Sequence, residues 1–83
     1  MIRMYTTPHC GYCAAARRLL DSRRYAFVEI DVSKDRELRQ RVSRSVGNYR
    51  TVPMVFIGDE FIGGYNELAA LDRSGVLAAK LAA

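Results

Sequence analysis

Two cysteines, Cys10 and Cys13, form a C-x-x-C motif and are the only cysteines of this 83-residue chain. A strand-like run, residues 2–5, precedes the motif, and an Ala/Leu-rich helical run, residues 14–20, follows it. Unpaired N–H groups and the helix dipole favour an anion at a helix N-terminus, so a thiolate at Cys10 is stabilised and reactive there. The spacing predicts thiol–disulfide exchange, with Cys10 as the exposed nucleophile and Cys13 as the buried residue that resolves mixed disulfides.

Other uses of the two cysteines are packing, a metal site and haem attachment. Zinc takes four ligands, and only His9 lies near the cysteines, so a distant carboxylate would have to complete the site. Haem attachment requires a histidine directly after the second cysteine, where this chain has Ala14. Redox chemistry is the use that these residues favour, and we expect no resident metal.

The length and composition predict one small domain, residues 1–83, in which 49% hydrophobic residues supply the core. No apolar stretch is long enough to span a bilayer, and the N-terminus lacks a signal-peptide pattern. Two cysteines so close in sequence cannot form a disulfide that links distant parts of the chain. A chain with only this pair of cysteines suits a reducing compartment. We therefore expect a cytoplasmic monomer that has no membrane partner.

Basic residues are concentrated in one segment, residues 34–50. It carries six of them, at positions 34, 36, 39, 41, 44 and 50, against Asp35 and Glu37, and the net charge of the whole chain is +4. An arginine-rich helix could bind nucleic acid, but no aromatic residue is interleaved with the arginines before Tyr49, and no nucleic-acid-binding motif is present. We therefore expect no nucleic-acid partner.

Hydrophobic periodicity and turn residues predict the element order β-α-β-α-β-β-α. Ser33 and Asn66 are the expected helix caps. A strand–helix–strand crossover implies a parallel pair, and the later hairpin adds antiparallel strands. The expected fold class is α/β, a four-stranded mixed sheet flanked by helices in a short thioredoxin-like fold. Other small α/β folds share this order, so the cysteines decide between them. The expected strands are 2–5, 25–32, 54–57 and 60–62, and the expected helices are 14–20, 34–46, 66–71 and 76–81.

Two further motifs lie where the strands end. Thr51-Val52-Pro53 precedes the strand at 54–57, on the side where Cys10 should emerge. Its proline is either a simple turn device or a cis-proline that exposes the Val52 backbone to a peptide-like substrate. Gly63-Gly64-Tyr65-Asn66 is either a tight turn or a place where a ligand approaches the backbone, beside a helix N-terminus suited to a carboxylate.

Together, C-G-Y-C, T-V-P about forty residues later and V-F-I-G-x-x-F-I-G-G-Y resemble the glutaredoxin family over nearly the whole chain. Thioredoxin fits less well, because the chain lacks its tryptophan before the first cysteine and has Tyr12 in place of its proline. The resemblance implies reduction of protein–glutathione mixed disulfides and of protein disulfides, with glutathione as co-substrate. It implies that Cys10 carries the glutathionyl group and that Pro53 is cis. The glutathione-binding positions that it implies are Tyr12, Thr51, Val52, Pro53, Gly64, Tyr65 and Asn66.

Two departures from the family pattern and one further resemblance concern the identity of the thiol that binds. Many glutaredoxins have a lysine for the glycyl carboxylate where this chain has Thr7, and Arg50 is the candidate replacement, with Arg39 or Arg41 behind it. Asn66 stands where the family often has aspartate, and Glu67 is a candidate to compensate. The segment 48–50 before T-V-P also resembles mycoredoxins, relatives that use mycothiol. Weaker glutathione affinity or a different low-molecular-weight thiol is therefore an alternative.

Gly11 stands where proline is common in the family. Some dithiol glutaredoxins with glycine or serine here bind a 2Fe–2S cluster between two subunits, with ligands from the first cysteine, here Cys10, and from glutathione. A cluster-binding dimer is therefore a second alternative. A redoxin that thioredoxin reductase reduces directly is a third.

Overall fold

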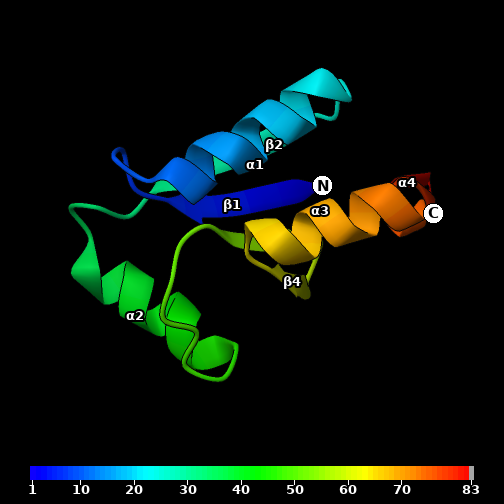
Figure 1. Ribbon diagram of the computed structural model, residues 1–83. Helices are drawn as coiled ribbons and strands as arrows, with labels where there is room; N and C mark the ends of the chain where they lie inside the picture. Colours follow the sequence, from blue (N-terminus) through cyan, green and yellow to red (C-terminus); the bar gives the residue numbers. More distant parts are fainter. Residues whose placement is uncertain (83) are drawn as a thin grey trace.

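The computed structural model describes residues 1–82. The order is β-α-β-α-β-β-α with a last short helix, as expected from the sequence, and Gly75 separates the last two helices with a left-handed backbone, φ 83°. Figure 1 shows the arrangement. The elements are β1 (Ile2–Thr6), α1 (Gly11–Ser22), β2 (Phe27–Asp31), α2 (Arg36–Ser45), β3 (Met54–Ile57), β4 (Glu60–Gly63), α3 (Tyr65–Ser74) and α4 (Val76–Ala82).

The four strands form one mixed sheet in the order β2-β1-β3-β4. Strands β1 and β2 are parallel, with Ile2 opposite Phe27, because α1 crosses over between them. Strand β3 runs antiparallel to β1, with Tyr5 opposite Met54, and the β3–β4 hairpin adds the last edge. The expected mixed sheet and thioredoxin-like fold are confirmed.

Alternating side chains divide the sheet into two faces, since successive strand residues point to opposite sides. Helices α1, α3 and α4 pack on one face over a fully buried aliphatic cluster that includes Met4, Leu20 and Leu68. Helix α2 covers the other face alone, where Val42 meets Met54 and Phe56. In Figure 1, α2 lies apart from the other helices, across the sheet from α1 and α3. No helix within residues 1–82 is both long and apolar enough to cross a membrane.

Both expected helix caps are wrong. Helix α2 is capped by Asp35, whose carboxylate accepts a hydrogen bond from the Leu38 amide at 3.0 Å, while the Ser33 amide donates to Asp31 in the preceding turn. Helix α3 is capped by Gly64, which places Asn66 inside the first turn. Serine, aspartate and asparagine all favour this position, so the choice between near neighbours depends on where the chain turns.

Candidate active site around Cys10

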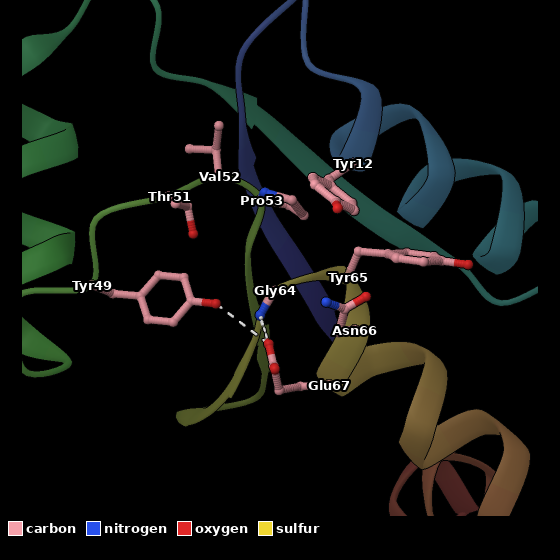
Figure 2. A pocket seen from close by; sticks show the side chains of 9 residues that line it. All are labelled: Tyr12, Tyr49, Thr51, Val52, Pro53, Gly64, Tyr65, Asn66 and Glu67. Atoms are coloured by element: carbon pink, nitrogen blue, oxygen red, sulfur yellow. Dashed lines mark hydrogen bonds between the residues drawn. The ribbon is translucent and has the colours of Figure 1, made fainter.

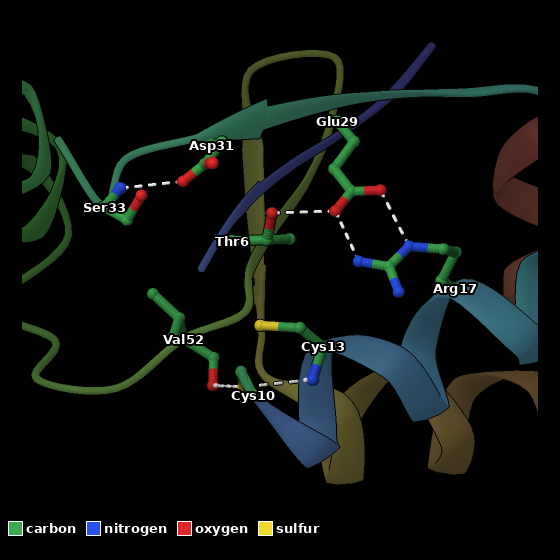
Figure 3. Close-up of polar contacts among 8 residues, drawn as sticks. All are labelled: Thr6, Cys10, Cys13, Arg17, Glu29, Asp31, Ser33 and Val52. Atoms are coloured by element: carbon green, nitrogen blue, oxygen red, sulfur yellow. Dashed lines mark hydrogen bonds and ion pairs between the residues drawn. The ribbon is translucent and has the colours of Figure 1, made fainter. Parts of the chain in front are cut away.

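Cys10 is the N-cap of α1, so the helix begins at Gly11, earlier than the expected residue 14. Its backbone is extended, and its Sγ accepts a hydrogen bond from the Cys13 amide at 3.1 Å. The Cys10 thiol donates to the Val52 carbonyl at 3.5 Å, a contact drawn in Figure 3. Cys10 is half-buried rather than fully exposed. A sulfur that accepts an N–H at the start of a helix is placed where negative charge is stabilised.

Cys13 is a free thiol with no exposed surface, as expected for a resolving cysteine. Burial raises the pKa of Cys13 to about 12, and the contact with Cys10 adds to that increase. The Thr7 backbone and the positive charge of Arg17 act in the opposite direction on the same pKa. The two sulfurs therefore have different environments: one borders solvent at a helix start, and the other is held protonated in the core.

A polar cluster, not found from the sequence, lies beside Cys13 on the same side of the sheet. The buried Thr6 hydroxyl donates to Glu29 Oε2 at 2.8 Å, and Arg17 Nε donates to Glu29 Oε1 at 2.9 Å (Figure 3). The Arg17 guanidinium, followed by the Thr6 hydroxyl, holds the pKa of the Glu29 carboxyl below its usual range. Arg17 lies one turn after Cys13 on α1, so Glu29 and Thr6 fix a cation close to the buried thiol.

Next to the cysteines, a pocket of about 190 Å³ gathers residues from three segments of the chain. It contains every expected glutathione-binding residue except Arg50, and the Val52–Pro53 peptide is cis, as the resemblance implies. Figure 2 shows the lining side chains converging from α1, the loop before β3 and the start of α3. The lining residues are Tyr12, Tyr49, Thr51, Val52, Pro53, Gly64, Tyr65, Asn66 and Glu67.

Tyr49 is the pocket residue that sequence reasoning gave no role. Its hydroxyl donates to Glu67 Oε1 at 3.4 Å, and the Gly64 amide donates to the same oxygen at 2.7 Å (Figure 2). A Cβ on Gly64 would lie 2.9 Å from the Tyr49 hydroxyl oxygen, and Gly63 has a φ of 121° that other residues rarely adopt. The close approach of Tyr49 and Glu67 therefore requires both glycines. The signal in the sequence was an aromatic residue two positions before T-V-P.

Two tyrosines form the opposite wall of the pocket. Tyr12, in the first turn of α1, stacks on Tyr65, in the first turn of α3, with ring centroids 6.2 Å apart and planes inclined by 29°. Tyr12 is 62% exposed, so its ring is available to a bound molecule. The stack links two helix N-termini, both of which favour negatively charged groups.

Arg50 lies outside this pocket and lines a neighbouring hollow against α2, of about 680 Å³. Arg39 borders the same hollow, and its guanidinium donates to the Arg50 carbonyl at 3.5 Å. Arg41, the third candidate for a carboxylate, is exposed and does not line either cavity. Among residues 1–82, no three His, Cys, Asp or Glu side chains gather closely enough to hold a metal ion.

A thioredoxin-like sheet with a C-x-x-C pair at the start of α1 defines a thiol–disulfide redox protein. Residues 2–62 match the family model described as Glutaredoxin. Glutaredoxin from Pseudomonas aeruginosa is 41% identical over 80 residues, which cover 96% of this chain and 94% of that protein. The chain belongs to the glutaredoxin family.

Solved structures agree with this assignment. The solution structure of glutaredoxin from Brucella melitensis is 40% identical, with a TM-score of 0.82 over 94% of this chain and 84% of that one. A crystal structure of a buckwheat glutaredoxin–glutathione complex is 28% identical, with a TM-score of 0.87 over 98% of this chain and 76% of that one.

Proposed function

We propose that the protein reduces protein–glutathione mixed disulfides and, secondarily, protein disulfides, with glutathione as co-substrate. The observation that carries the proposal is the position of Cys10 Sγ: it caps α1, accepts the Cys13 amide and lies beside the carbonyl of Val52, a residue that lines the pocket. Its partners are glutathionylated or disulfide-containing proteins. The protein acts as a monomer in a reducing compartment such as the cytoplasm.

In the monothiol route, the Cys10 thiolate attacks the glutathione-side sulfur of a mixed disulfide. The Cys10–glutathione disulfide forms, the bond to the protein sulfur breaks, and the protein thiolate leaves and takes up a proton. A second glutathione thiolate then attacks the glutathionyl sulfur on Cys10, which releases oxidised glutathione and restores the Cys10 thiolate. The amide of Cys13 and the start of α1 stabilise Cys10 both as nucleophile and as leaving group.

In the dithiol route, Cys13 attacks the Cys10 sulfur of a mixed disulfide and expels the other thiolate. The product is a Cys10–Cys13 disulfide, which external glutathione reduces. Cys13 must first lose its proton, and burial, which acts on Cys13 also when Cys10 is bonded to glutathione, raises its pKa and makes this deprotonation unfavourable at neutral pH. The resolving step is therefore slower than attack by Cys10, which favours the monothiol route.

The pocket accounts for a peptide-like thiol beside Cys10. The Val52 backbone can pair with the cysteinyl residue of glutathione, and Tyr12 can flank it. Asn66, Tyr65 and Gly64 lie at the start of α3, where backbone amides and the helix dipole suit the γ-glutamyl carboxylate. A glutathione complex of a relative, the buckwheat glutaredoxin, supports this choice of thiol.

The decisive experiment is a reductase assay on a glutathionylated peptide, run with glutathione and, separately, with mycothiol or thioredoxin reductase. Cys10→Ser should abolish activity, because Cys13, the other cysteine, is fully buried. Cys13→Ser should keep deglutathionylation and lose most reduction of protein disulfides. An inactive Cys13→Ser protein would contradict the monothiol route, and faster turnover with mycothiol or thioredoxin reductase would replace glutathione by that reductant.

A 2Fe–2S cluster between two subunits is a second candidate function, and two features of the site fit it. A Cβ at Gly11 would meet no atom within 4 Å, so the helix start is open, and Cys10 is the accessible sulfur for a ligand. Cys13 has no exposed surface, so its sulfur would not reach a cluster shared between two subunits. Anaerobic purification, a visible spectrum and the oligomeric state test this candidate.

A further inference from the structure

The hollow beside α2 concentrates positive charge without compensation. Arg36, Arg39, Arg44 and Arg50 line it, and no Asp or Glu does. Three other cations in residues 1–82 form ion pairs: Arg17 with Glu29, Arg23 with Asp72, and Lys80 with Glu60. None of the four arginines of the hollow has a carboxylate partner among these residues. The hollow therefore carries four arginine charges that no carboxylate of residues 1–82 neutralises.

The arginines are arranged along one stripe of α2. Arg36, Gln40 and Arg44 recur every four residues, and Arg39 lies between the first two on the side of the loop. The rise of a helix separates Arg36 from Arg44 by about 12 Å along the axis. Arg39 is held in place because its guanidinium donates to the Arg50 carbonyl. The stripe is thus long enough for several residues of an extended chain, at about 3.3 Å each.

The stripe is continuous with the site of thiol exchange. Tyr49 lines both the hollow and the pocket next to Cys10. Arg50 leads directly into Thr51 and Val52, and the Val52 carbonyl accepts from the Cys10 thiol. A chain that leaves the pocket past Tyr49 would therefore run onto the arginines.

We propose that this surface of α2 docks an acidic segment of the protein substrate, close in sequence to the cysteine that Cys10 attacks. This inference deepens the proposed function and rests on it for the identity of the substrate. Two or three carboxylates within about four residues of an extended segment would match the 12 Å stripe. Contacts of this kind raise the rate of encounter and select among substrates more than they raise raw affinity.

Two other occupants fit the observations less well. A single glycyl carboxylate of glutathione needs one cation, for which Arg50 is the candidate from the sequence, and leaves the α2 stripe unused. A nucleic acid needs exposed aromatic faces for stacking bases, but the aromatic residue of the hollow, Tyr49, packs edge-on against Phe61 with ring centroids 4.9 Å apart. Its hydroxyl is also engaged by Glu67.

The kinetic test compares two glutathionylated peptides, one with three Glu residues within four positions of its cysteine and one with Gln in their place. In the unmodified protein, we expect kcat/KM to be about tenfold higher for the acidic peptide at low salt, and we expect 0.5 M salt to remove the difference. The double variant Arg36→Gln, Arg44→Gln should bring the ratio close to one. The control Arg18→Gln, Arg73→Gln removes the same charge from exposed sites on α1 and α3 and should keep the ratio.

A binding test measures docking to this surface separately from catalysis. A fluorescent acidic peptide without cysteine should bind the unmodified protein in an anisotropy titration. The double variant Arg36→Gln, Arg44→Gln should weaken the affinity at least threefold. The charge-conserving double variant Arg36→Lys, Arg44→Lys should keep most of the binding. Equal weakening by the Arg18, Arg73 control, or no preference for the acidic peptide, overturns the inference. Tighter binding of a single-stranded oligonucleotide through the same arginines overturns it in favour of nucleic acid. If the peptide binds but neither glutathionylated peptide is reduced, the proposed function fails while the docking surface stands.

Discussion

The two faces of the sheet differ in how they are covered. On the face of α1, α3 and α4, the core residues Met4, Leu20 and Leu68 have no exposed surface. On the face of α2, Val42 and Phe56 remain 9% and 6% exposed. There, the Arg3 guanidinium lies over the Phe56 ring, 4.7 Å from its centroid, where the other face has aliphatic packing.

This difference separates the chemistry of the protein from its recognition surface. Cys13 lies on the well-packed face, and the same packing that buries it holds α1 and thus the cap residue Cys10 in place. Helix α2 contributes one buried residue, Val42, and one partly buried residue, Leu38, to the core, and four of its ten residues are arginines. A helix with so little core can change its surface residues without disturbing the cysteines, which suits it to selecting partners.

Substitutions that create cavities on each face are the strongest test of this comparison. Leu20→Ala should lower the free energy of unfolding by about 3 kcal/mol, because the fully buried site leaves a cavity. Val42→Ala should cost only about 1 kcal/mol, because fewer buried atoms are lost and alanine favours the helix. Urea denaturation of both variants measures the difference. Equal losses would show that α2 is as much a part of the core as α1.

A pH series tests whether packing on the α1 face controls the resolving cysteine. Burial, the largest cause of the raised pKa of Cys13, persists when Cys10 is bonded to glutathione, so the thiolate fraction of Cys13, and with it the resolving rate, should rise about tenfold per pH unit between pH 7 and 9. The measurement is release of glutathione from a preformed Cys10–glutathione disulfide by stopped flow. Cys13→Ser, which should release none, is the control. A rate that levels off below pH 8 would contradict the inferred protonation of Cys13.

The fold could be predicted because it depends on patterns that the sequence carries locally. Alternating apolar residues define the strands, and the C-x-x-C, T-V-P and G-G motifs mark the ends of elements that meet at one edge of the sheet. The structure brings Tyr12, Val52 and Asn66 to one pocket, although 54 positions separate the first and last of them.

The residues that could not be predicted depend on contacts between distant elements. Tyr49 and Glu67 meet only because the loop before β3 lies against the start of α3. Glu29 is one of several acidic residues in the sequence, and its role depends on the register of β2 against β1, which brings Glu29 within reach of Arg17 on α1. The predicted cap of α2 was wrong for a related reason. Asp35 and Ser33 are equally suitable cap residues, and the path of the turn decides between them.

The ion pair of Glu29 offers a smaller test on the well-packed face. Because the folded pKa of Glu29 is lowered, the carboxylate stabilises the fold above its unfolded pKa, and this stability is lost as the pH falls through the folded value. Glu29→Gln should therefore lower the free energy of unfolding by about 1 kcal/mol at pH 7 and by little near pH 3. Glu60→Gln, which removes the more exposed pair with Lys80, should have a smaller effect at pH 7. Identical pH profiles of unmodified and Glu29→Gln protein would remove Glu29 from this role.

Arg50 provides the finest distinction between the two faces, because it stands where the pocket ends and the α2 hollow begins. If it supplies the charge for the glycyl carboxylate, Arg50→Ala should raise KM for a small glutathionylated substrate about threefold and leave kcat unchanged, since one partly solvated ion pair is lost. Arg73→Ala, an exposed charge on α3, is the matched control. An unchanged KM would mean that Arg50 is a solvated cation, and that the α2 face contributes to protein recognition alone. A fall in kcat would instead show that Arg50 helps to orient the reacting sulfur, and therefore acts in the chemical step and not only in binding.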